Sequence, residues 1–170
     1  ALYLQKKDGA LEAPKFFSTF TGVSDIAVAD WNTDGRPDIL LLSADERQIG
    51  ITQLDDKGRI SFPKILPLEG RPLAMAFGSL KLEDKPALAL IVDLDGKREL
   101  QLRTRDGKIR RQKLAESFKA EPSSMLIHDI NQDGLPDIVL LIPFEKIKIL
   151  LQEAGKDFEE LDLAPPGGGT

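Results

Sequence analysis

Short apolar runs recur along the whole chain, bounded by turn residues such as glycine, proline, asparagine and aspartate. The runs are about four to eight residues long and rich in valine, isoleucine and leucine, which favours β-strands. The expected strands are Val23–Ala29, Asp38–Ser43, Gln48–Leu54, Arg59–Leu66, Pro72–Phe77, Ala87–Asp93, Arg98–Arg103, Lys108–Leu114, Ser123–His128, Asp137–Ile142, Lys146–Leu151 and Phe158–Leu163. A helix is the competing interpretation at Leu114–Phe118, which is short, and at Glu145–Leu151, part of which alternates with period two.

The pattern repeats along the chain every 49 to 50 residues. Asp30–Ile39 and Asp129–Ile138 are nearly identical and lie 99 residues apart, which is two periods. A degenerate copy lies between them, at Phe77–Leu88. Other markers with the same spacing are Pro37, Pro86 and Pro136; Gly9, Gly58 and Gly107; and Leu2, Ile51, Leu100 and Ile149. Agreement among independent markers argues against coincidence and indicates a repeat protein.

Four strands in each unit of about 50 residues are typical of a β-propeller blade. A β-sandwich also contains many short strands, but it does not require a repeat. The expected fold is therefore all-β, with four-stranded antiparallel blades in an incomplete ring of about three and a half. The expected divisions are residues 1–22, the second half of a preceding blade; 23–71, a blade with an acidic loop; 72–121, a blade with a degenerate loop; 122–163, another blade with an acidic loop; and 164–170, a proline- and glycine-rich linker.

Such an arc would not close alone, because propellers contain about four to eight blades. An open arc leaves apolar blade faces bare. Three explanations stay open: a fragment of a longer protein, an arc completed by another chain (for example as a homodimer), or an arc capped by a partner. The absence of an initiator methionine and the proline–glycine tail favour a fragment.

Composition narrows the available chemistry. The 170 residues include no cysteine, which excludes disulfides, cysteine metal sites and cysteine nucleophiles. The single histidine, His128, argues against a multi-histidine metal site and against a Ser-His-Asp triad. The net charge of −5 argues against nucleic-acid binding. No apolar run approaches the roughly 20 residues that a membrane span needs.

Two acidic loops carry the candidate metal ligands. Positions 1, 3, 5, 7 and 9 are Asp30, Asn32, Asp34, Arg36 and Asp38 in the first loop, and Asp129, Asn131, Asp133, Leu135 and Asp137 in the third repeat. Alternate positions of a tight loop turn side-chain oxygens toward one centre, and position 7 can offer its backbone carbonyl. Calcium takes about six to eight oxygens, so it fits better than magnesium, which demands a strict octahedron.

These loops differ from EF-hands, which need an acidic residue at position 12 and a following helix. Position 12 is Leu41 or Leu140, inside an apolar run. The alternative is that both acidic loops are ordinary Asp/Asn/Gly turns with a structural role alone. Two matching copies, together with the mutual repulsion of clustered carboxylates, favour two calcium sites over that alternative.

The pattern Asp-x-Asn-x-Asp-Gly-x-Pro-Asp, followed by an apolar strand, resembles the FG-GAP/VCBS repeat over about residues 1–163. That family builds β-propellers, including the heads of integrin α subunits and many secreted bacterial proteins. The resemblance implies that each acidic loop holds calcium through the five residues given above. The middle repeat departs from the pattern at Gly78, Ser79 and Leu80, so we expect no metal there.

The resemblance implies a non-catalytic, calcium-binding propeller segment of an extracellular, periplasmic or cell-surface protein. Its expected role is contact with proteins or glycans, within a larger chain or assembly. No catalytic or cofactor-binding residue is expected. The alternative is the propeller portion of a polysaccharide-active or quinone-dependent enzyme, in which His128 beside Asp129, with Lys146 or Arg111, could supply acid–base chemistry.

Two further features could contact a partner. Trp31 follows the first ligand position, where it could be a binding hot spot or could pack between blades. The hairpin Arg103–Arg111 is rich in arginine and lysine, so it could contact an anionic partner or remain a solvated turn.

Overall fold

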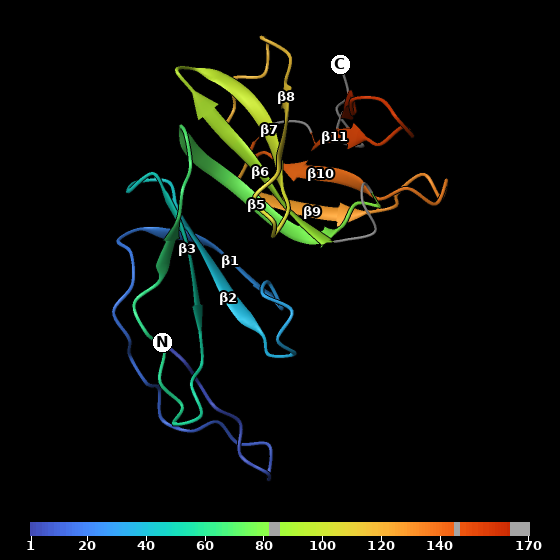
Figure 1. The fold of residues 1–170 in the computed structure, drawn as a ribbon. Helices are drawn as coiled ribbons and strands as arrows, with labels where there is room; N and C mark the ends of the chain where they lie inside the picture. The colour runs from blue at the N-terminus through green and yellow to red at the C-terminus, as the bar shows by residue number, and fades with distance from the viewer. Residues whose placement is uncertain (82–85, 145–146, 164–170) are drawn as a thin grey trace.

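The computed structural model describes residues 1–81, 86–144 and 147–163, and this part of the chain is all-β, without a helix (Figure 1). Twelve strands form three four-stranded antiparallel sheets, each from strands consecutive in sequence. The first sheet contains β1 (Val23–Ala29), β2 (Asp38–Ser43), β3 (Gln48–Gln53) and β4 (Lys64–Leu66). The second contains β5 (Arg71–Ser79), β6 (Pro86–Leu94), β7 (Lys97–Arg103) and β8 (Ile109–Lys113). The third contains β9 (Ser124–His128), β10 (Asp137–Leu141), β11 (Ile147–Leu151) and β12 (Glu159–Leu163).

The expected four-stranded antiparallel units are confirmed, with one marked difference at β4. The sequence predicts a strand over Arg59–Leu66, but the regular ladder covers Lys64–Leu66 alone. Pro63 and Pro67 flank this short strand, and proline has no N–H to donate to a ladder. The start of the expected strand survives only as an isolated bridge between Leu54 and Ile60.

Residues 1–17 fold back on themselves without forming a regular strand. Two isolated antiparallel bridges hold the segment, Leu2 with Lys15 and Gln5 with Leu11. A turn lies at Asp8–Gly9: Asp8 Oδ1 accepts the N–H of Ala10 at 3.0 Å, and Gly9 has a φ of 87°. The second half of a preceding blade, expected over residues 1–22, is therefore not formed as regular strands in the described structure. The expected linker at residues 164–170 and the strand start at Lys146 lie outside the described residues.

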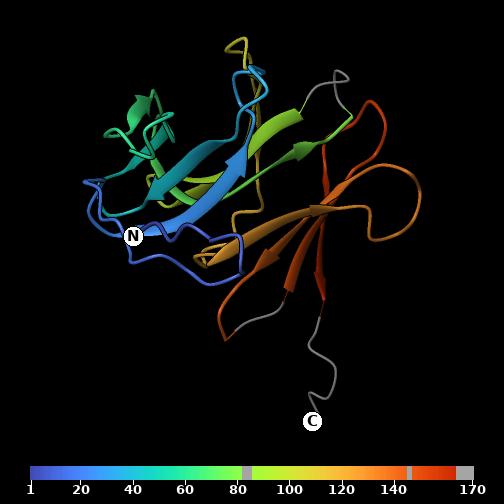
Figure 2. The same cartoon turned by 90° about the horizontal axis from the view of Figure 1, so that it is seen from below.

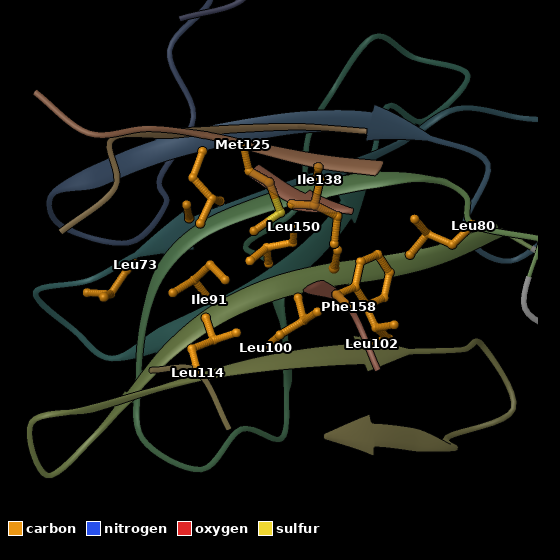
Figure 3. Close-up of a cluster of buried hydrophobic side chains, with 14 of the residues drawn as sticks. Leu73, Leu80, Ile91, Leu100, Leu102, Leu114, Met125, Ile138, Leu150 and Phe158 are labelled. Atoms are coloured by element: carbon orange, nitrogen blue, oxygen red, sulfur yellow. The ribbon is translucent and has the colours of Figure 1, made fainter. Parts of the chain in front are cut away.

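Two apolar clusters lie between the sheets. The first joins the first and second sheets and contains Leu40, Leu42, Ile49, Met75, Leu88, Leu90 and Val92. The second joins the second and third sheets, and Figure 3 shows its side chains meeting between them, among them Leu73, Ile91, Leu100, Met125, Ile138, Leu150 and Phe158. The second sheet is therefore covered on both faces, which explains why β6 is a nearly continuous apolar run rather than an alternating one.

The first strand of each sheet lies at the meeting line of the three sheets, with β5 in contact with both β1 and β9 (Figure 2). Large side chains of one strand pack against small residues of the strand before it. Met75 packs in the cluster that Ala27 and Ala29 contact. A Cβ added at Gly78 would lie 3.3 Å from Ile127 Cδ1, so glycine permits the close approach of β5 and β9.

The outer faces of the first and third sheets expose apolar side chains. Ile26 and Val28 of β1 are 61% and 66% exposed, and Leu126 of β9 is 56% exposed. In the described part of the chain, no helix is long and apolar enough to cross a membrane.

Candidate cation-binding loops

The first acidic loop joins β1 to β2, and its carboxylates bind its own backbone. Asp30 accepts the N–H of Asp34 at 3.1 Å on one oxygen and that of Gly35 at 2.9 Å on the other. Asp38, which is 3% exposed, accepts the N–H of Trp31 at 2.8 Å. The first and last acidic positions therefore close the loop from both ends.

The central positions of this loop form successive turns. Asn32 Oδ1 accepts the N–H of Asp34 at 2.8 Å, and Asp34 Oδ1 accepts the N–H of Arg36 at 2.9 Å. Gln53, the last residue of β3, donates from Nε2 to Asp34 Oδ2 at 3.1 Å. This hydrogen bond is the largest cause that lowers the pKa of Asp34, and the Arg36 N–H adds to it, so the carboxylate is favoured.

The second acidic loop, which belongs to the third repeat and is named the third loop after it, joins β9 to β10 and repeats this arrangement. Asp137 is fully buried; its Oδ2 accepts the N–H of Ile130 at 3.0 Å, and its Oδ1 accepts that of Gln152 at 2.9 Å. Asp129 Oδ2 accepts the N–H of Gly134 at 2.9 Å, as Asp30 does for Gly35.

The middle of the third loop also matches. Asn131 Oδ1 accepts the N–H of Asp133 at 3.1 Å, and Asp133 Oδ1 accepts that of Leu135 at 2.7 Å. Asn131 Nδ2 donates to Asp133 Oδ2 at 2.9 Å. In each loop, the side chains at positions 1, 3, 5 and 9 are therefore brought into one hydrogen-bonded network.

The two loops share one backbone conformation. Position 4 is left-handed in both, with φ of 55° at Thr33 and 63° at Gln132. Position 6 is also left-handed, with φ of 82° at Gly35 and 87° at Gly134, where a glycine avoids strain. The repeated sequence thus specifies a repeated loop shape.

The carboxylates are turned toward N–H groups rather than toward a common centre. Among the described residues, no three acidic or histidine side chains lie close enough together to hold a metal ion. One oxygen stands apart: Asp129 Oδ1 is shielded from solvent and accepts no hydrogen bond from the described residues. A buried carboxylate oxygen needs a donor or a cation. The donor set, carboxylate and amide oxygens, therefore suits calcium, although binding requires some side chains to rotate inward.

Two glutamines belong to these loops and were missed from the sequence. Gln53, the last residue of β3, and Gln152, the residue after β11, are 99 residues apart, so the repeat period could have revealed them. Gln53 binds its own loop at Asp34. Gln152, 4% exposed, instead donates to Leu80 O at 2.8 Å in the second sheet, and its own Oε1 is buried without a partner among the described residues.

The other sequence candidates lie close to these loops. Trp31 packs edge-on against Phe77, with ring centroids 6.0 Å apart, which places it between the first and second sheets. His128 pairs with Asp137 across β9 and β10 and lines an open pocket at the meeting line of the sheets. In the basic hairpin, Arg110 forms a salt bridge with Asp157 at 3.0 Å.

Searches of protein-family models and of curated proteins find no match to this chain.

Proposed function

We propose that this chain is a calcium-stabilised, non-catalytic segment of a β-propeller of the FG-GAP/VCBS type, in an extracytoplasmic protein that contacts proteins or glycans. Three features support the propeller architecture: the 49-residue period, the four-stranded units, and the contact of β5 with both β1 and β9. The strongest support for calcium is the shared shape of the two acidic loops, together with Asp129 Oδ1, which is buried without a hydrogen-bond partner among the described residues.

When bound, calcium would supply positive charge and coordination to oxygens that otherwise repel one another. Asp30, Asn32, Asp34 and Asp38 would hold it in the first loop, with the Arg36 carbonyl. Asp129, Asn131, Asp133 and Asp137 would hold it in the third, with the Leu135 carbonyl. Because the unfolded chain lacks arranged ligands, calcium would stabilise the folded state by mass action.

The two exposed sheet faces suit the rest of a ring or a partner. Ile26 and Val28 lie on one outer face, and Leu126 lies on the other. We propose that further blades, either in the same polypeptide or in an associated one, cover these faces.

Thermal unfolding in EDTA and in millimolar calcium tests the calcium proposal. We expect calcium to raise Tm, since a ligand at 100 times its Kd stabilises by roughly 2.7 kcal/mol. The double variant Asp34→Asn with Asp133→Asn should lose most of this rise. Glu116→Gln, an exposed acidic change outside both loops, is the control. A calcium-independent Tm for the wild type would contradict the proposal.

Trp31 provides a local readout. It is the only tryptophan and lies between two candidate ligands, Asp30 and Asn32. Terbium, a calcium substitute, should emit on indole excitation when bound in the first loop. Asp34→Asn should reduce that emission, whereas Asp133→Asn should leave it unchanged. Emission that is equally sensitive to both changes would place the ion elsewhere.

A further inference from the structure

The second sheet sends one basic side chain to each acidic loop. Lys81, two residues after β5, donates from Nζ to Gly134 O at 2.5 Å, in the third loop. Arg105, in the turn between β7 and β8, donates from Nη1 to the hydroxyl of Thr33, in the first loop. The sheet that lacks the acidic motif thus brings positive charge to both loops that have it.

Each contact lies beside candidate ligands. Gly134 is the residue whose N–H binds Asp129 Oδ2, so the Lys81 ammonium reaches the same short stretch of backbone. Arg105 lines a pocket of about 380 Å³ together with Asp30 and Thr33.

Leu80, the residue before Lys81, is anchored to the third repeat. Gln152 Nε2 donates to Leu80 O, and both residues are buried, at 4% and 0% exposed. This buried hydrogen bond fixes the residue before Lys81 against the third sheet. Two neighbouring residues, Leu80 and Lys81, therefore each form a hydrogen bond with the third repeat.

The other cation near the first loop is directed elsewhere. The Arg36 guanidinium donates to Leu54 O at 3.1 Å and forms a salt bridge with Asp56 at 2.8 Å. The Arg36 charge still helps to lower the pKa of Asp34, but it comes from the loop itself. Arg105 is the basic side chain that reaches this loop from the neighbouring sheet.

We propose that Lys81 and Arg105 are intrinsic counter-ions of the acidic loops. Each stabilises its loop in the absence of metal, because a cation relieves repulsion among nearby carboxylates. Each also lowers the affinity of that loop for a divalent cation, because like charges repel. The effect on affinity rests on the proposed calcium binding, whereas the effect on the metal-free protein does not.

The test follows the amides of Gly35 and Gly134 by NMR during a calcium titration at low salt. These glycines hold the same position in the two loops and donate to Asp30 and Asp129 at the same distance, 2.9 Å. Lys81→Met should tighten the response at Gly134 about three- to tenfold and leave Gly35 unchanged. Arg105→Met should do the reverse, and Lys81→Arg should resemble the wild type.

Lys97→Met is the matched control, because Lys97 is exposed and lies in the β6–β7 hairpin, at the opposite end of the second sheet. In EDTA, Lys81→Met and Arg105→Met should lower Tm more than Lys97→Met does. High salt should shrink every difference by screening.

Two results separate the possible failures. If calcium shifts neither glycine amide in the wild type, the calcium proposal fails, and the Tm values in EDTA decide whether the counter-ions exist. If calcium binds both loops with affinities that neither Lys81→Met nor Arg105→Met changes relative to Lys97→Met, the counter-ion proposal is overturned and calcium binding stands.

Discussion

The junction between the first and second sheets relies on apolar packing more than the junction between the second and third sheets does. At the second junction, the Gln112 side chain donates to Phe158 O at 2.7 Å and accepts the Phe158 N–H at 2.8 Å. Gln152 adds its buried bond to Leu80. At the first junction, Arg105 donates to the exposed Thr33 hydroxyl, and Asp25 accepts the N–H of Met75 at 3.3 Å, a longer contact.

The difference shows that similar repeats can be joined by different kinds of contact. Apolar contacts tolerate small displacements, whereas paired hydrogen bonds fix direction and register. We therefore expect the first sheet to open before the third, so that its amides exchange with solvent faster than those of β10 and β11.

The largest expected effect comes from removing a core side chain at the first junction. Leu40 is fully buried, and Leu40→Ala should cost about 2–5 kcal/mol through lost burial and a cavity. Hydrogen exchange should accelerate in β1 to β3 and change little in β10. Equal acceleration in all three sheets would mean that they unfold as one unit. Ile138→Ala is the matched variant at the other junction.

A smaller loss is expected at the paired glutamine. Gln112→Leu leaves both backbone groups of Phe158 without their side-chain partner and should cost about 1–3 kcal/mol. Chemical denaturation measures the change, with Lys113→Leu, at the exposed neighbour, as control. If Gln112→Leu is no more destabilising than Lys113→Leu, the hydrogen-bonded character of the second junction contributes nothing measurable.

The aromatic pair gives the next effect. Trp31→Leu keeps an apolar side chain but removes the edge-on contact with Phe77, and should cost about 0.5–1.5 kcal/mol. Exchange in β1 and β2 should increase slightly. An unchanged free energy of unfolding would show that Trp31 does not hold the first junction and would restore the idea of a partner contact.

The smallest effect depends on pH. Burial is the largest cause that raises the pKa of Asp25, against the opposing hydrogen bonds from Met75 and Ile26. A raised folded-state pKa means that the stability contributed by the protonated carboxyl is lost as pH rises through that value. The stability of Asp25→Asn relative to the wild type should therefore be higher at pH 7 than in acid. A pH-independent difference in Tm would contradict it.

Much of the fold followed from the sequence because its signals are local. β1 and β2 have the bounds that their apolar runs predict, and the left-handed glycines at position 6 specify the loop bend. β4 was overestimated because two prolines interrupt an otherwise apolar run. The five-residue pattern of each loop was likewise legible, since the residues are close in sequence.

What the sequence did not reveal depends on neighbours that only the folded chain brings together. Gln53 and Gln152 hold the same place in their repeats, yet one binds its own loop and the other binds another sheet. Lys81 and Arg105 reach their loops from 53 and 72 residues away, respectively. The direction of the carboxylates toward backbone N–H groups also depends on side-chain rotamers, which residue spacing does not specify.

The close approach at Gly78 implies that the repeats have a fixed order. Ala27 and Ala29 in the first repeat, and Ala76 and Gly78 in the second, provide the small positions against which the next sheet packs. The third repeat has Leu126 and His128 at these positions, 50 residues after those of the second. In a permuted chain with the third unit in the middle, Leu126 and His128 would replace the small residues on the face that packs against the next sheet. The order of the three units therefore cannot be changed without a steric clash.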